Sequence, residues 1–179
     1  MLCFFQTRRK EVLPMLESVM NRRSIRKYTP EPLTAQEIHT LLECAMLAPS
    51  AMNRRPWRIV VVTDRAVLNA LRENHPYAGM LAQAPACVCI CCEACDEAGY
   101  WQQDCAAATM NLLIAARDMG LGSCWMGVAP RKERMDAIRR VLHMPESVSP
   151  FCLIALGHPA EEPPRPQRWD ETMVHENRW

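Results

Sequence analysis

The sequence lacks an apolar run long enough to cross a membrane, and it lacks a strong net charge of either sign. A membrane-spanning helix needs about 20 consecutive apolar residues, and no run of that length occurs in the 179 residues. The apolar start at residues 1–5 is too short for a signal peptide, and basic residues follow it instead of preceding it. With a net charge of +1, no global positive field exists to attract a nucleic acid. We therefore expect a soluble, cytoplasmic protein that binds neither membranes nor nucleic acids.

Metal-ligand and dinucleotide motifs are also missing. The five histidines show no ligand spacing, and the one Cys-x-x-Cys pair, Cys92 and Cys95, has no second pair to complete a metal site. Gly120 and Gly122 follow a predicted helix instead of a strand, and the third glycine of the dinucleotide fingerprint is absent. The sequence therefore predicts no metal site, no Rossmann site and no nucleophile–base–acid set.

Cysteine, by contrast, is abundant. Ten cysteines without a signal peptide indicate free thiols in a reducing compartment. Cys87, Cys89 and Cys91 alternate along a predicted strand, so they share one face with Cβ atoms about 7 Å apart. One straight strand does not surround a metal ion, and buried cysteine acting as a small hydrophobic residue is the favoured interpretation. A thiol switch at Cys92 and Cys95 is an open alternative.

The length and the hydrophobic pattern predict one α+β domain, with a central mixed or antiparallel sheet flanked by helices. Hydrophobic residues make up 49% and charged residues 23% of the chain, which is ordinary globular composition. A strand at 57–63 is expected to become fully buried. The remaining elements that the pattern predicts are helices at 12–21, 34–48, after Asp64, at 98–119 and after Pro130, and strands at 86–92, 124–126 and 151–156.

The two ends of the chain are expected to differ from the packed core of this domain. Met15 would also make a natural start, so residues 1–14 are expected to be an N-terminal extension, disordered or with little role in the fold, and 15–179 the domain. From Pro159 to Trp179 no period holds and prolines cluster, which predicts an extended arm that does not fold alone. Its tryptophans need a surface to bury them, and a partner subunit is the natural one.

The densest positive charge lies at residues 20–30. Residues 1–30 contain seven Lys and Arg against two Glu. In an extended segment, the side chains of Arg22, Ser24 and Arg26 point to one side. Two guanidinium forks with a hydroxyl between them suit a phosphate group. These residues alone also allow a solvated basic loop.

Four blocks of the sequence together resemble the FMN-dependent nitroreductase family, and they occur in the family's order over residues 15–179. The blocks are Arg22–Tyr28, Ala48–Trp57, Trp101–Asp104 with Asn111–Leu113 and Gly120–Gly127, and Gly157–Pro159 with Arg165–Trp179. The resemblance implies a nitroreductase-like fold and an intertwined homodimer with two FMN sites at the subunit interface. It also implies reduction of nitroaromatic, quinone or related acceptors by a ping-pong mechanism, with NADH or NADPH as the transient reductant.

The resemblance further implies which residues hold the cofactor phosphate. The expected phosphate and ribityl contacts in the basic segment are Arg22 and Ser24, with Arg26 alongside. Arg23 is included as well, because the twist of the segment is not known from the sequence. A late cation of the family matches Arg165 or Arg168, of which Arg168 is slightly preferred. No residue is expected to be catalytic, because the flavin itself carries the hydride chemistry.

The contacts to the flavin ring are expected from two other blocks. Asn53 matches an asparagine beside the ring, where an amide both donates to and accepts from the pyrimidine edge. Around it the resemblance places Pro49, Ser50, Ala51 and Met52. In the second block, Trp125 is expected among the cofactor contacts, and the backbone N–H groups of Met126 and Gly127 are expected to approach the reactive nitrogen. Glycine allows a close approach.

Arg55 departs from the family pattern, since many members have glutamine at this position before Pro-Trp. A cation there favours anionic substrates or simply points to solvent. Two alternatives to the nitroreductase activity stay open at this point. One is a flavoprotein of the same fold with another task, such as flavin oxidation or reductive dehalogenation. The other is a cysteine-based thiol or metal redox sensor that binds no flavin.

Overall fold

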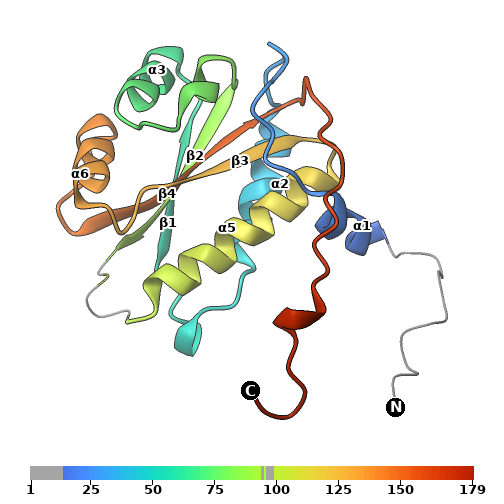
Figure 1. Cartoon of the computed structure of the whole chain (residues 1–179). Helices are drawn as coiled ribbons and strands as arrows, with labels where there is room; N and C mark the ends of the chain where they lie inside the picture. Colours follow the sequence, from blue (N-terminus) through green and yellow to red (C-terminus); the bar gives the residue numbers. More distant parts are fainter. Residues whose placement is uncertain (1–13, 94, 96–98) are drawn as a thin grey trace.

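The chain forms a four-stranded sheet with helices on both faces (Figure 1). The structure is a computed structural model and describes residues 14–93, 95 and 99–179. The α+β prediction is confirmed, and all strand pairs are antiparallel. The expected N-terminal extension lies, except for residue 14, outside the described residues. No described helix combines the length and the apolar character that a membrane span requires.

The sheet has the strand order β1-β2-β4-β3. The strands are β1 (Trp57–Val62), β2 (Ala86–Glu93), β3 (Gly122–Gly127) and β4 (Val148–Gly157). The two inner strands, β2 and β4, are almost entirely buried, as predicted for β2 from its apolar run. β1 is an edge strand and leaves Arg58 and Val61 exposed. The prediction that β1 is fully buried is therefore wrong, because a β-branched run does not reveal which strand becomes the edge.

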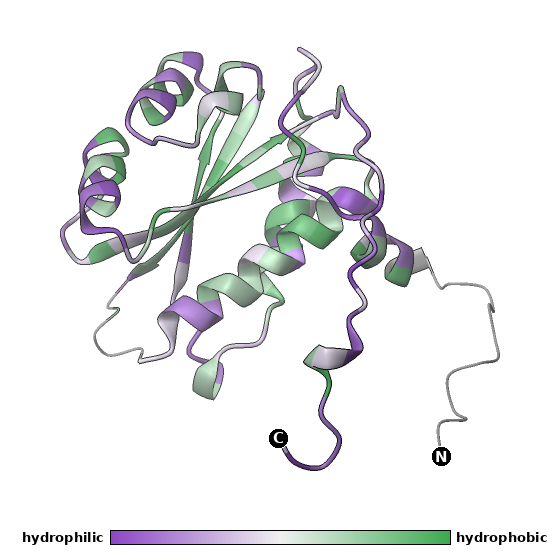
Figure 2. Ribbon diagram, in the orientation of Figure 1, coloured by the Kyte–Doolittle hydropathy of each residue, from purple (hydrophilic) through white to green (hydrophobic). Residues whose placement is uncertain are grey.

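Two layers of helices cover the sheet. On one face lie α2 (Ala35–Met46) and α5 (Trp101–Asp118), and on the other lie α3 (Arg65–Glu73) and α6 (Lys132–Val141). Figure 2 shows hydrophobic residues along the inner strands and over much of the length of α5. Buried alanines on α2 and α5 allow the two helices to approach closely: Ala45, Ala108 and Ala116.

The helix ends follow the sequence signals. The N–H of Glu37 donates to Thr34 Oγ1 at 3.1 Å, and the N–H of Thr34 donates back to Glu37 Oε2 at 2.7 Å. This predicted capping box starts α2. Asp64 caps α3 by accepting from the N–H of Val67 at 3.0 Å. Each cap stabilises its helix by about 1 kcal/mol.

The basic segment is extended and lies along the free edge of β3. It follows α1 (Pro14–Asn21), and the N–H of Ile25 donates to the carbonyl oxygen of Ser123 at 2.9 Å. Further on, Tyr28 forms an antiparallel bridge with Pro159, after the end of β4. A Cβ atom at Gly122 would lie 2.8 Å from Ile25 Cγ2, so the glycine permits this close approach. We call residues 22–29 the basic arm.

The C-terminal segment leaves the body of the molecule after Pro159. Residues 164–179 are all exposed, and the 3-10 turn η3 (Glu171–Met173) is the one element assigned to them. Trp169 is 75% exposed and Met173 78% exposed. In Figure 1 this segment runs away from the sheet past α5. A single chain therefore leaves the apolar side chains of this segment without cover.

Candidate cofactor site

A basic pocket of about 860 Å³ lies between the basic arm, the C-terminal end of α5 and the start of the C-terminal segment. Four arginines line it: Arg22, Arg23, Arg117 and Arg165. Glu161 and Glu162 belong to the same lining. Three parts of the chain that are far apart in sequence thus bring their positive charges to one place. We call this cavity the arginine pocket.

Arg23 is the most constrained cation in the arginine pocket. Its Nε donates to the carbonyl oxygen of Pro164 at 3.0 Å, and its Nη1 donates to the carbonyl oxygen of Arg22 at 2.6 Å. Its Nη2 is shielded from solvent and has no hydrogen-bond partner among the residues that the structure describes. Desolvation and then the positive charges of the nearby arginines, first Arg168, lower the pKa of Arg23.

This arrangement fits a phosphate group. A buried donor without a partner is costly, and clustered guanidinium groups repel one another until an anion joins them. A phosphate supplies both the acceptor oxygens and the negative charge. The residues of the arginine pocket therefore suit the phosphate end of a nucleotide-like ligand such as FMN.

The basic arm does not follow the predicted alternation, which placed Arg22 and Arg26 on one side and Arg23 on the other. Arg22 and Arg23 are consecutive, yet both line the arginine pocket, whereas Arg26 lines a different pocket. The reason lies in the helix before the arm, because the N–H of Arg22 still donates to the carbonyl oxygen of Ser18 at 3.0 Å. The extended period starts only after that residue. Ser24 follows and pairs with Ser123 of β3.

A second pocket, of about 620 Å³, lies at the free edge of β3. Its lining includes Arg26 and Lys27 of the basic arm together with Trp125, Met126 and Gly127. We call it the edge pocket. In an antiparallel pair the backbone groups alternate between the partner strand and the free side.

The free side of β3 presents backbone donors to the edge pocket. The carbonyl oxygen of Ser123 faces that side, since it accepts from the basic arm. By alternation Trp125 and Gly127 also turn their backbone N–H groups outward, whereas Met126 turns toward β4. A Cβ atom at Gly127 would meet nothing within 4 Å, so the backbone is open to a ligand there. The backbone N–H groups that this block offers to a ligand are thus those of Trp125 and Gly127, and not that of Met126 as expected.

Two side chains that the sequence interpretation missed hold Gly127. His75 Nε2 lies 3.0 Å from the Gly127 carbonyl oxygen, and Arg134 Nη1 donates to the same oxygen at 3.1 Å. The N–H of Tyr77 donates to His75 Nδ1 at 3.2 Å, so Nε2 carries the proton. Burial lowers the pKa of His75, which favours the neutral ring. No local pattern marks His75, because it lies 52 residues from Gly127 in sequence. Arg134 lies only seven residues away, but the turn that brings it back to Gly127 has no sequence signal that the interpretation used.

Residues 49–53 lie in a strained turn beside the N-terminus of α5. The turn includes η1 (Ala51–Asn53), and the N–H of Ala51 donates to Asp104 Oδ1 at 2.9 Å. Met52 and Asn53 adopt left-handed backbone angles with φ of 51° and 54°. Non-glycine residues with such angles are rare and often occur at functional sites. The side chains of Pro49, Met52 and Asn53 are exposed, whereas Ser50 and Ala51 are half-buried.

In a single chain the predicted cofactor contacts fall into two separate groups. Ala51 contacts Asp104 near the start of α5, whereas Ser18, just before the basic arm, donates to Asp118 Oδ1 at the end of α5 at 2.6 Å. Fourteen residues of helix place these two contacts about 21 Å apart along the axis. Figure 1 shows η1 and α1 beside opposite ends of α5. One chain thus brings Arg22, Arg23 and Arg165 together, but not with Asn53.

Arg55 lies at a third position. It has a φ of 49° and lines a pocket of about 590 Å³ between α2 and β1, together with Arg54 and Arg58. Its backbone N–H donates to Ser50 Oγ at 2.9 Å, which ties it to the turn at residues 49–53. In one chain, Arg55 belongs neither to the arginine pocket nor to the edge pocket.

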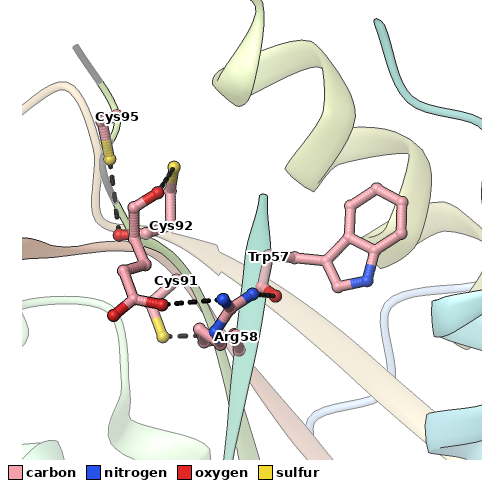
Figure 3. Close-up of polar contacts among 6 residues, drawn as sticks. Trp57, Arg58, Cys91, Cys92 and Cys95 are labelled. Atoms are coloured by element: carbon pink, nitrogen blue, oxygen red, sulfur yellow. Dashed lines mark hydrogen bonds and ion pairs between the residues drawn. The ribbon is translucent and has the colours of Figure 1, made fainter. Parts of the chain in front are cut away.

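The cysteines of β2 pack as small hydrophobic residues. Cys91 and Cys92 point to opposite faces of the strand, and the Cys91 thiol donates to the carbonyl oxygen of Arg58 at 3.1 Å (Figure 3). Burial raises the pKa of Cys92, which disfavours the reactive thiolate. Within the described residues, no group of three or more potential ligands is arranged to hold a metal ion.

Comparison with known proteins identifies the fold and its class. The Nitroreductase family model matches residues 19–75 and 72–158, so the chain belongs to the nitroreductase family. A putative NADH dehydrogenase/NAD(P)H nitroreductase of Methanothermobacter thermautotrophicus is 41% identical over 93% of this chain and 88% of its own length.

Solved structures agree with this family membership. A putative NADH dehydrogenase/NAD(P)H nitroreductase of Bacteroides thetaiotaomicron has a TM-score of 0.91 at 37% identity, covering 94% of this chain and 100% of its own. A putative nitroreductase of Desulfovibrio desulfuricans in complex with FMN has a TM-score of 0.80 at 27% identity, covering 94% and 99% of the two chains. The nitroreductase-like fold predicted from the four sequence blocks is confirmed.

Proposed function

We propose that this protein reduces nitroaromatic, quinone or related small acceptors, taking electrons from NADH or NADPH in a ping-pong reaction. The family membership makes it an FMN-dependent NAD(P)H oxidoreductase. The observation that supports the site assignment is the buried Arg23 Nη2, without a described partner, in a pocket lined by four arginines. A phosphate is the group that such a donor set selects.

The chain's own residues would bind, orient and tune the cofactor. Arg22, Arg23 and Arg165 would hold the phosphate in the arginine pocket, with Arg168 adding positive charge nearby. When bound, FMN supplies the hydride chemistry. The outward N–H groups of Trp125 and Gly127 would face the ring from the edge pocket. Donors there stabilise the negative charge that develops on reduction.

The proposal includes a homodimer, because one chain holds only part of the expected site. The turn at residues 49–53 would then complete the cofactor site of the partner subunit. Exposed apolar side chains near both parts of the site suit such an interface: Leu16, Val19, Met20, Met46, Leu47 and Met52. The exposed C-terminal segment would bury Trp169 against the partner. A cytoplasmic location, expected from the free thiols, belongs to the same proposal.

Absorbance spectra of the purified protein test this function directly. We expect a two-banded flavin spectrum, or its appearance after addition of FMN, and bleaching by NADPH or NADH without oxygen. Reoxidation by a quinone or nitroaromatic compound would complete the cycle. The variant Arg23→Gln is expected to weaken FMN binding at least about tenfold, the loss of one charge-assisted contact. Equal affinity of the wild-type protein for FMN and riboflavin would contradict the phosphate assignment.

A further inference from the structure

We propose that Glu161 is the positioning residue of the arginine pocket: it locks the basic arm to the C-terminal segment so that Arg22, Arg23 and Arg165 converge. The inference rests on the proposed binding of a phosphorylated flavin. Glu161 itself would not contact the phosphate as a donor, because a carboxylate has only acceptor oxygens to offer.

The Glu161 carboxylate accepts hydrogen bonds from the backbone of the basic arm. Its Oε1 accepts from the N–H of Arg26 at 2.5 Å and from the N–H of Lys27 at 3.1 Å. These residues are 135 and 134 positions away in sequence. A carboxylate that accepts two successive backbone N–H groups forms charge-assisted bonds, which are stronger than neutral ones.

The hydrogen bonds of Glu161 begin where the backbone pairing between the basic arm and the C-terminal segment stops. The N–H of Thr29 donates to the carbonyl oxygen of His158, and the N–H of Ala160 donates to the carbonyl oxygen of Lys27, both at 2.9 Å. No further backbone bond joins the two segments among the described residues. The Glu161 side chain therefore extends the pairing by two more N–H groups, up to Arg26.

A second contact joins the basic arm to Pro164, further along the C-terminal segment. Arg23 Nε donates to the carbonyl oxygen of Pro164 at 3.0 Å. Between the two contacts lies the short segment from Glu161 to Pro164, which contains two consecutive prolines. Proline fixes φ near −65°, so this spacer is stiff. Arg165 follows directly, and its position relative to Arg23 is thus set by contacts at both ends.

Glu161 also decides which donors are left for a phosphate. The N–H groups of Arg26 and Lys27 are occupied by its carboxylate. A phosphate in the arginine pocket is thereby directed to the guanidinium groups and away from the arm's backbone. Loss of the carboxylate would free these N–H groups and release the arm from the spacer, so the guanidinium groups would no longer be held together.

Three variants test this inference. Glu161→Ala removes the acceptor, and Glu161→Gln keeps an oxygen acceptor but removes the charge. The control, Glu146→Ala, removes an exposed carboxylate between α6 and β4, away from the arginine pocket. Fluorescence titration would give the dissociation constants of FMN and of riboflavin for each protein. Thermal unfolding would be measured alongside to confirm that each variant folds.

We expect Glu161→Ala to weaken FMN binding about tenfold or more and to change riboflavin binding less than about twofold. Glu161→Gln should lie within about threefold of the wild-type protein, and Glu146→Ala should match it. Unchanged FMN affinity in Glu161→Ala would overturn the inference, and so would an equal loss for riboflavin. If Glu161→Ala does not fold, Glu161→Ser takes its place, since its shorter side chain does not reach the two N–H groups.

Amide hydrogen exchange separates the failure of this inference from that of the proposed function. In the flavin-free protein, the amides of Arg26 and Lys27 should exchange faster in Glu161→Ala than in the wild-type protein, while that of Ile25 is unchanged. Unchanged exchange at both amides would show that Glu161 does not hold the basic arm, whatever the ligand is. If exchange accelerates but the wild-type protein binds no FMN, Glu161 does hold the basic arm but the proposed function is wrong. The role of Glu161 in positioning the arginines for a phosphate is then wrong as well.

Discussion

The backbone N–H of Ala51 donates to Asp104 Oδ1 at 2.9 Å, joining the turn at residues 49–53 to the start of α5. The second carboxylate oxygen of Asp104 is buried and has no hydrogen-bond partner among the described residues. Buried polar groups normally have partners. The contact therefore gives Asp104 a structural role, because it ties the turn to the helix.

Replacement of Asp104 by alanine should loosen this turn. We expect Asp104→Ala to lower the free energy of unfolding by about 1–3 kcal/mol, because the N–H of Ala51 loses its acceptor in a half-buried position. Urea unfolding would measure the change. The matched control is Gln103→Ala, one residue earlier and exposed. Equal stability of Asp104→Ala and Gln103→Ala would show that the contact contributes nothing.

His75 should make the stability of the protein depend on pH. Its pKa is lowered in the folded state by burial, so the unfolded chain binds a proton that the folded chain does not. Between the folded and the unfolded pKa values, stability is thus expected to fall as pH falls, while above the unfolded pKa, about 6.5, the contribution is fully present. The urea midpoint at a series of pH values from neutral to acidic would measure this slope.

The variant His75→Gln provides the comparison for the pH effect. It cannot titrate, so the difference between its slope and that of the wild-type protein isolates the contribution of His75. His39→Gln, on the exposed face of α2, serves as the control for loss of a histidine. Identical slopes for the wild-type protein and His75→Gln would contradict the prediction.

A side chain at Gly122 should displace the basic arm. The added methyl group of Gly122→Ala would lie 2.8 Å from Ile25 Cγ2, and such overpacking typically costs about 1–3 kcal/mol. Thermal unfolding and FMN affinity should both decline. In the double variant Gly122→Ala with Ile25→Ala, the steric part of the loss should be relieved. Gly79→Ala is the control, because a Cβ atom at Gly79 meets nothing within 4 Å.

The cysteine pair should be dispensable for electron transfer. The Cys95 thiol donates to the carbonyl oxygen of Cys92 at 3.4 Å, and burial raises the pKa of the Cys92 thiol. We expect Cys92→Ala with Cys95→Ala to keep FMN bound and its reduction by NADPH within about twofold of the wild-type rate, since the raised pKa of Cys92 disfavours its reactive thiolate. Loss of activity with flavin still bound would favour a thiol-based function instead.

Much of the fold followed from local signals. The capping box at Thr34 and Glu37, the Asp64 cap and the apolar run of β2 depend on residues close in sequence, where propensity and period act directly. The family resemblance likewise came from contiguous blocks. The β1 strand was recognised for the same reason, but its place at the edge was not, because strand order depends on long-range pairing.

By itself, the sequence determined the α+β class, most element boundaries and the basic character of the arm. The tertiary structure alone decided that Arg22 and Arg23 share one pocket with Arg117 and Arg165, and that Asn53 lies at the far end of α5. It alone showed that Glu161 holds the basic arm and that His75 holds Gly127. Such contacts join residues tens to more than a hundred positions apart, and only the packing of the whole chain sets the distances between them.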